Sequence, residues 1–502
     1  MPIQIPSIER LQQIAESFYL DLSPERLESF RTIIAGALGS YERVDQLVEP
    51  TLPVKYPRSP GYRPGPEENK YNAWYYKTSV RGSDKGKLLG KKVVLKDNIC
   101  LAGVPMMNGS KVLEGFVPSI DATIVTRILD AGGEIVGKAV SEDLCFSGSC
   151  FTCATGAVLN PHNTAHSSGG SSSGSAALVA ADEVDMAIGG DQGGSIRIPS
   201  CWCGVYGLKP TYGLVPYTGI FPIELTIDHT GPITKNVEDA ALLLEVIAGV
   251  DGLDPRQTGL AVKPYKKLLA TGESKLKVGI VKEGFGWEGL SEEDVDEMVR
   301  EAAYSFTKAG AMVEEVSIPF HRDGVHIWNP IATDGATALM ITGNSMGTNW
   351  KGFYTTQLLD TYGQSRVARA NDFSETVKLV VLLGQYMLDN YQGKYYAKAQ
   401  NLSRSLKQAY DDALNKYDVL VMPTLPLKAT PIPATDCSLG EYVSRALEMI
   451  PNTAPFNVTG HPAMNVPCGM SSGLPVGMMI IGKFGEDETV LRAAHVFEKI
   501  KG

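Results

Sequence analysis

The sequence predicts an α/β fold in which helices lie on both faces of a central β-sheet. Short apolar runs typical of buried strands alternate with helical segments. Residues 92–96 and 134–140 are interpreted as strands on either side of a helix at 122–131. A helix at 176–181 is followed by a strand at 185–188. This alternation is typical of sheets that are covered by helices on both faces.

The same alternation continues later in the chain. Residues 277–282 and 417–422 are expected to be strands, and residues 313–316 form a shorter candidate. A strand at 475–481 and a helix at 486–499 are expected near the C-terminus. Between these strands lies a long helical tract, which we interpret as an insertion that covers the site.

Two amphipathic helices precede the core, over residues 7–20 and from Ser23-Pro24 onward, and a proline-rich linker follows at 50–66. Because no strand lies beside these helices, we expect them to pack on the main domain or on a second subunit. The chain is therefore expected to comprise four parts. These are N-terminal helices and linker (1–66), a first core part (67–318), a helical small-domain insertion (319–410) and a second core part (411–502).

Composition excludes several classes of protein. The 502 residues carry a formal net charge of -10, which argues against nucleic acid as a main partner. No run of 18 or more apolar residues is present, so no membrane span is expected. The first residues lack a basic segment followed by an apolar one, and a cytoplasmic location is expected by default.

The eight cysteines are too sparse for a disulfide framework. Cys150 and Cys153 have CxxC spacing, and Cys201 and Cys203 would complete four thiolates for a zinc ion. The second pair has the wrong spacing, and both pairs lie among apolar and glycine residues. Buried thiols that pack as small hydrophobic groups are the favoured interpretation, and no metal or cofactor is expected.

The chemistry is expected in residues 169–199, where two Gly/Ser clusters enclose an apolar helix and a strand. Ser195 follows two glycines and is the candidate nucleophile. Successive backbone amides in such a turn can converge on one oxygen. The candidate oxyanion hole is formed by the amides of Gln192, Gly193 and Gly194, together with that of Ser195 itself.

The general base is less evident, because none of the seven histidines lies in an obviously catalytic neighbourhood. A lysine kept neutral by burial is the alternative. Lys96 ends an apolar strand and precedes Asp97-Asn98, so its amine is a candidate, although a strand-end lysine often extends to solvent. Ser171 and Lys96 together would relay the proton of Ser195, as in other Ser–Lys variants of the hydrolytic triad.

Over roughly residues 85–500 the chain resembles the amidase signature family. The resemblance is carried by an ordered set of motifs, namely VLKDN (94–98), GGSSSGS (169–175), DQGGSIRIP (191–199), GVYGLKP (204–210), MPT (422–424) and NVTGHP (457–462). It implies a mixed central sheet and a reaction that needs no cofactor. It also implies Lys96 as the base, Ser171 as a bridging serine that takes part in a cis peptide, and Ser195 as the nucleophile that forms an acyl-enzyme.

Gln192 stands where many family members have Thr, and Ser173 where many have Gly. With the N-terminal helical extension, Gln192 makes the chain similar to the free-standing bacterial amidases that accompany nitrile hydratase. It is less similar to the tRNA-dependent amidotransferases of the same family. The resemblance implies a homodimer that forms through the N-terminal helices, and a small-molecule amide as substrate.

The acyl pocket is expected to be apolar, with Phe146, Ile227, Trp328 and Ile450 as candidate walls. Gly170 and Asp191 are also candidate substrate-site positions, and Asp191 with Arg197 is expected to brace the loop. Such a pocket suits aliphatic or aryl primary amides. Carbamates (urethanes) and aryl acylamides stay open as alternatives, because the same acyl-enzyme steps hydrolyse them.

Two other classes of protein fit parts of the sequence. A Ser–His–Asp hydrolase would use Ser172 or Ser345, each within a GxSxG pattern, with His461 or His495 downstream. A nucleotide-binding module would use the glycine-rich clusters, although the GxxxxGK[ST] motif is absent. Neither alternative gives a role to Lys96.

Overall fold

The computed structural model describes residues 3–59, 61–270 and 275–501, and the chain divides into two compact units, Met1–Leu52 and Pro53–Gly502. The first unit contains α1 (Ile8–Ser17) and α2 (Pro24–Asp45). The hydroxyls of Ser7 and Ser23 cap these helices by accepting hydrogen bonds from the first-turn amides. Pro24 occupies the first turn of α2, where no backbone donor is needed.

The second unit is built on one mixed sheet with strand order β1-β3-β2-β4-β6-β5-β10-β11-β9-β7-β8. Pairs β2/β3, β2/β4, β7/β8 and β7/β9 are parallel, and the other pairs are antiparallel. The strands are β1 (Trp74–Arg81), β2 (Lys92–Lys96), β3 (Glu134–Ala139), β4 (Met186–Asp191), β5 (Tyr206–Lys209), β6 (His229–Thr234), β7 (Lys277–Val281), β8 (Met312–Val316), β9 (Val419–Pro423), β10 (Ala463–Ser471) and β11 (Leu474–Gly482).

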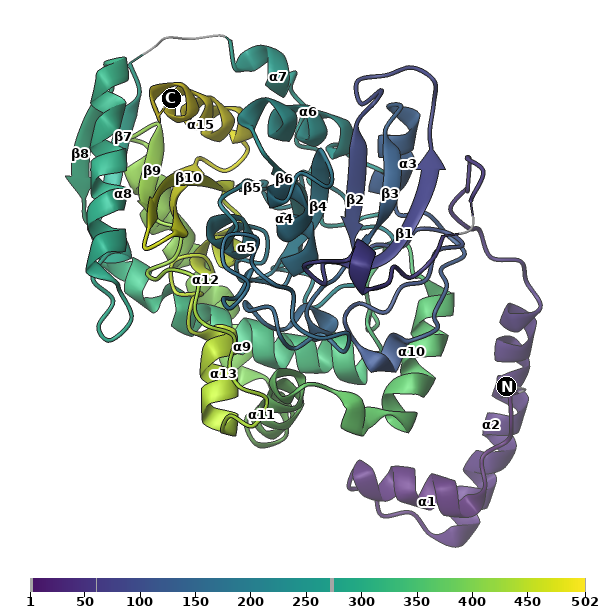
Figure 1. Cartoon of the computed structure of the whole chain (residues 1–502). Coiled ribbons are helices and arrows are strands. Elements are labelled where there is room, and N and C mark those ends of the chain that lie inside the picture. The colour runs from purple at the N-terminus through teal and green to yellow at the C-terminus, as the bar shows by residue number, and fades with distance from the viewer. Residues whose placement is uncertain (1–2, 60, 271–274, 502) are drawn as a thin grey trace. The chain divides into compact units, whose positions relative to one another are not determined.

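Helices cover both faces of this sheet, as the sequence predicts (Figure 1). They are α3 (Thr123–Asp130), α4 (Ser173–Ala180), α5 (Arg197–Trp202), α6 (Val237–Ile247), α7 (Tyr265–Leu268), α8 (Glu293–Ser305), α9 (Gly324–Ala336), α10 (Thr356–Ala368), α11 (Glu375–Tyr391), α12 (Lys394–Leu414), α13 (Leu439–Leu447), α14 (Pro455–Thr459) and α15 (Asp487–Lys501). None of the helices in the described residues combines the length and apolar character that a membrane span requires.

The structure confirms the short strand predicted at 313–316, which forms the edge strand β8. Strands β1, β5, β6 and β10 were not among those that the sequence predicts. Strand β5 has only four residues, and β6 carries Gly231 and Pro232, so neither shows the apolar alternation of a typical strand. The tract expected to be helical contains α9 to α12, of which α11 and α12 both pack against α9.

The parallel pairing of β2 with β4 positions the site. Leu95 lies opposite Ile188, so the ends of the two strands meet at the same edge of the sheet. Lys96 ends β2 and Asp191 ends β4. The apolar helix α4, buried almost throughout, starts directly after Ser172 and packs on both strands. The two Gly/Ser clusters are therefore brought to the strand end that carries Lys96.

Candidate active site

The amine of Lys96 is fully buried and points toward the first Gly/Ser cluster. Its Nζ donates to Ser171 Oγ at 2.8 Å and to the Gly190 carbonyl at 3.3 Å. Burial lowers the pKa of Lys96, while Cys145, Asp191 and Glu142 oppose that shift. The amine therefore does not extend to solvent, and burial disfavours its charged form.

Ser171 lies between Lys96 and the second cluster. The Gly170-Ser171 peptide is cis, and the Ser171 carbonyl accepts the Glu142 amide at 3.2 Å. The next amide, that of Ser172, donates to the Ser195 carbonyl at 3.2 Å, which joins the two clusters through the backbone. Among the described residues no hydrogen bond is formed directly between the hydroxyls of Ser171 and Ser195.

The loop that follows β4 is held by its carbonyl groups. Asn457 Nδ2 donates to the Asp191 carbonyl at 2.9 Å, and Trp328 Nε1 donates to the Gln192 carbonyl at 2.6 Å. In a planar trans peptide the next N–H points opposite to the carbonyl. These two bonds therefore point the N–H groups of Gln192 and Gly193 away from the side chains of Asn457 and Trp328. Neither amide donates a hydrogen bond within the part of the chain that the structure describes.

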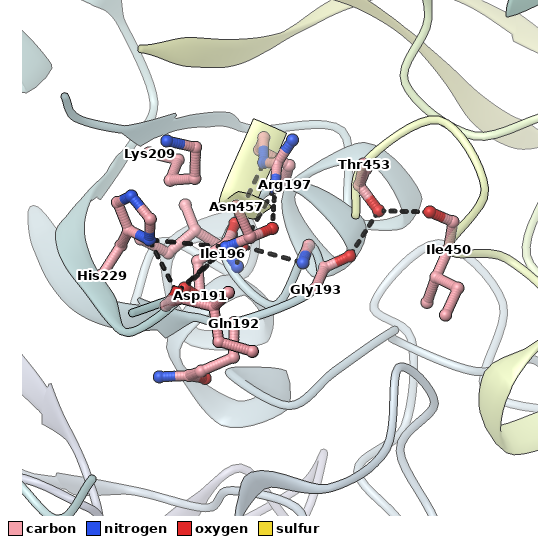
Figure 2. Close-up of polar contacts among 12 residues, drawn as sticks. Asp191, Gln192, Gly193, Ile196, Arg197, Lys209, His229, Ile450, Thr453 and Asn457 are labelled. Carbon is pink, nitrogen blue, oxygen red and sulfur yellow. Dashed lines mark hydrogen bonds and ion pairs between the residues drawn. The ribbon is translucent and has the colours of Figure 1, made fainter. Parts of the chain in front are cut away.

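Gly194 differs from its neighbours, contrary to the expectation that its amide faces an oxyanion. Its N–H donates to Asp191 Oδ1 at 2.8 Å and is not free. Thr453 fixes the preceding peptide, since its Oγ1 donates to the Gly193 carbonyl at 2.6 Å (Figure 2). Glycine is required at position 194, because φ is +136° and a Cβ would lie 2.4 Å from the Thr453 hydroxyl.

A buried ion pair between Arg197 and Asp191 also stabilises this loop. Arg197 donates through Nε to Asp191 Oδ2 and through Nη2 to Asp191 Oδ1, each at 3.0 Å, and both side chains are fully buried (Figure 2). Arg197 also donates to Asn457 Oδ1 at 2.8 Å. Burial alone would raise the pKa of Asp191, but Arg197 and Asn457 hold that pKa well below its usual range. Asp191 is thus a permanent anion that fixes the loop.

A narrow cavity of about 30 Å³ lies beside Ser195, Gln192 and Gly193. All four apolar residues expected in the acyl pocket line it, namely Phe146, Ile227, Trp328 and Ile450. Asp191 and Gly170 do not line this cavity. The cavity is also lined by residues that are not among the sequence-based candidates, namely Cys145, Ser147, Gly148, Ile198, Ile223, Ala332 and Leu447.

Asn457 and Thr453, which hold the loop, are likewise not among the sequence-based candidates. Asn457 begins the NVTGHP motif, so that motif is the signal that marks it. Nothing in the sequence around Thr453 singles it out. Trp328 was expected only as an apolar wall, whereas its indole N–H also anchors the Gln192 carbonyl.

The alternative interpretations find little support in the geometry. Ser172 Oγ bonds to the backbone of Gly190, and among the described residues neither Ser172 nor Ser345 bonds to a histidine. His461 pairs with Asp411 and Thr459, and His495 with Glu498. Among the residues described, all eight cysteines are free thiols, and no cluster of His, Cys, Asp and Glu could hold a metal ion.

A mixed sheet that presents a buried lysine, two serine clusters and a loop of oriented amides is the arrangement of an amide hydrolase. The Amidase family model matches residues 65–491, and the chain belongs to this family. It is 48% identical to an enantioselective amidase of Rhodococcus rhodochrous, over 99% of this chain and 96% of that protein.

Two solved structures share the fold. One is a 6-aminohexanoate cyclic dimer hydrolase, with a TM-score of 0.73 and 26% identity over 83% of this chain and 85% of that one. The other is the peptide amidase of Stenotrophomonas maltophilia, with a TM-score of 0.67 and 29% identity over 82% and 83%. The chain is thus an amidase, a hydrolase that acts on amides.

Proposed function

We propose that this amidase hydrolyses aliphatic or aryl primary amides to a carboxylate and ammonia through Ser195, Ser171 and Lys96. The observation that carries the proposal is the fully buried Lys96 amine, whose Nζ lies 2.8 Å from Ser171 Oγ. A neutral amine at this position is a base of the strength that serine activation requires.

In the proposed first step Lys96 takes a proton from Ser171 as Ser171 takes the proton of Ser195. Ser195 Oγ then attacks the amide carbonyl, and the amides of Gln192 and Gly193 stabilise the oxyanion. Ser171 returns a proton to the leaving nitrogen, which departs as ammonia. Water hydrolyses the acyl-enzyme through the same relay, so that the free enzyme and a carboxylate result.

The apolar walls of the cavity support the choice of acyl group. Phe146, Ile227, Trp328 and Ile450 offer no charge to the substrate, which suits aliphatic or aryl groups. The 48% identity to an enantioselective amidase supports an amide as the substrate. Carbamates and aryl acylamides use the same steps, and the experiment below distinguishes them.

The test is a panel of small primary amides, carbamates, anilides and esters, compared by kcat/KM with Ser195→Ala as the blank. We expect ammonia release from benzamide and short aliphatic amides, and its loss in the variant. A preference for carbamates or anilides of about tenfold or more, equivalent to about 1.4 kcal/mol, would overturn the substrate class. Turnover retained by Ser195→Ala would overturn the mechanism.

We further propose that the enzyme is a homodimer formed through its N-terminal helices. Large apolar side chains of this unit are exposed in the single chain, namely Phe18, Tyr19, Leu20, Phe30, Ile33, Tyr41, Val44 and Leu47. So many exposed large apolar side chains on a unit of this size point to an interface. The cytoplasmic location expected from the sequence stays a prediction.

A further inference from the structure

A second and larger cavity adjoins the one beside Ser195. Its volume is about 290 Å³, and it lies between α9 and α11. Phe146, Trp328 and Leu447 line both cavities and form the partition between them. On its far side the second cavity is walled by apolar residues of α11, including Leu383 and Met387. A substrate arm that passes the partition therefore enters apolar surroundings.

One acidic side chain interrupts this apolar lining. Asp334 of α9 lines the cavity and is only 3% exposed. Its Oδ2 is buried without a hydrogen-bond partner, and no other described residue forms an ion pair with its carboxyl group. Buried carboxylates are normally paired, because an unpaired buried charge is costly. Nothing in the described fold gives Asp334 a partner, so the ligand is the natural source of one.

We propose that the second cavity binds the distal end of the acyl group, and that Asp334 pairs there with a cationic nitrogen. The ligand class is an amide whose apolar acyl arm ends in an ammonium group. This inference rests on the proposed function, because it extends the acyl pocket of the same site. Trp328 and Asp334 are six residues apart on α9, which corresponds to about 9 Å along a helix. Trp328 lines the cavity beside Ser195, so the acyl chain starts at the Trp328 end of this span, and an extended chain of about eight bonds covers it.

The test compares two pairs of substrates in which an ammonium group replaces a methyl group. In the long pair, 8-aminooctanamide and nonanamide, the nitrogen reaches Asp334, whereas in the short pair, 4-aminobutanamide and pentanamide, it does not. The measured quantity is the kcat/KM ratio of the amino amide to the alkyl amide. We expect a higher ratio for the long pair. Asp334→Asn should lower that ratio by about tenfold and leave the short pair unchanged. Asp323→Asn, an exposed acid at the start of α9, is the matched control.

A second pair of variants is available if Asp334→Asn folds poorly. Leu383→Lys introduces a cation into the cavity from an exposed position and should abolish the long-pair preference, whereas the same change at Leu382, a more exposed residue that does not line the cavity, should not. An unchanged long-pair ratio in Asp334→Asn and Leu383→Lys overturns this inference. If nonanamide and benzamide are still hydrolysed, and Ser195→Ala is inactive, the proposed function stands. Without that hydrolysis, the proposed function itself fails.

Discussion

At the scale of single residues, the site depends on where two side chains of ordinary chemistry lie. A lysine in water is protonated at neutral pH and cannot accept a proton. Burial lowers the pKa of Lys96. The fold also places its amine within hydrogen-bond distance of Ser171 Oγ. A serine adjacent in sequence, Ser172, is just as buried, but among the described residues its hydroxyl bonds only to the backbone of Gly190. Position, and not residue type, separates the two serines.

The lowered pKa of Lys96 makes a prediction about pH. Below this pKa the amine is protonated and cannot act as a base, so kcat/KM should fall about tenfold for each pH unit on the acid side. Above it, kcat/KM should reach a plateau. The measurement is a pH profile of kcat/KM on a neutral amide, within the range where the enzyme stays folded. A kcat/KM that falls as the pH rises, where the amine is increasingly neutral, contradicts a lysine base.

Ser171→Ala and Ser172→Ala form a matched pair of variants. Loss of the Ser171 hydroxyl interrupts the proposed relay, and kcat should drop by about a thousandfold or more. Ser172→Ala removes a hydroxyl whose hydrogen bonds, within the described part of the chain, go to the backbone of Gly190, and most activity should remain. Steady-state kinetics, with circular dichroism to verify folding, measures both. The opposite ranking would favour Ser172 as the nucleophile of a Ser–His–Asp enzyme.

At the scale of elements, the loop after β4 is oriented by groups from three helical segments, two of which are distant in the sequence. Asn457 lies on α14, Trp328 on α9 and Arg197 on α5. Together with Thr453 they engage the carbonyls and the carboxylate of the loop and leave the amides of Gln192 and Gly193 free. Donors preorganised in this way need no rearrangement when charge develops on a substrate oxygen.

Trp328→Phe tests the hydrogen bond from the indole to the Gln192 carbonyl separately from the contact of this side chain with the cavity. The phenyl ring keeps an apolar surface, but the hydrogen bond to the Gln192 carbonyl is lost. We expect kcat to fall by about tenfold, equivalent to roughly one such bond, with a smaller change in KM. Phe146→Leu, which changes the wall without touching the loop, should act mainly on KM. Equal effects of both variants on kcat would argue against the anchoring role.

Arg197→Met should destabilise the fold strongly. It leaves Asp191 buried without its charge partner, and breaking a buried pair costs about 3–5 kcal/mol. Lys55→Met, which breaks a partly exposed pair with Asp130, should cost less than about 1 kcal/mol. Urea unfolding of both variants gives the two free energies. A cost below about 1 kcal/mol for Arg197→Met would show that the pair does not brace the loop.

At the scale of the whole chain, the sheet brings together residues that are far apart in the sequence. Lys96, Ser171 and Ser195 come from β2, the segment before α4 and the loop after β4, while Thr453 and Asn457 lie close to the C-terminal end of the sequence. The N-terminal unit, Met1–Leu52, has its own compact structure and an exposed apolar surface. That surface is where a second copy is proposed to bind.

The proposed dimer gives a prediction about association. Ile33→Glu places a charge on an exposed apolar position of α2 and should convert a dimer into a monomer. Thr32→Glu, one residue away and on a different face of the helix, should leave the dimer intact. Analytical ultracentrifugation of the full-length chain measures both. A wild-type monomer, or an Ile33→Glu dimer, contradicts the proposal.

The sequence alone determined the α/β class and the family, because apolar periodicity and an ordered set of motifs are local properties of a chain. The mixed sheet was implied by the resemblance to that family. The sequence also singled out Lys96, Ser171, Ser195 and the apolar candidates around them. The division of the chain into four parts stays a prediction. The sequence did not predict strands β5 and β6, because their pairing with each other, rather than a local apolar pattern, makes them strands.

Only the tertiary structure decided which groups are free to act. Both Gly193 and Gly194 lie in the same glycine pair, yet the amide of Gly194 is bound to Asp191. Thr453 carries no local signal, and neither does Asp334, whose Oδ2 has no hydrogen-bond partner among the described residues, because the folded chain determines what lies beside each side chain. Hydrogen bonds and burial are relations between distant segments, and a linear pattern does not contain them.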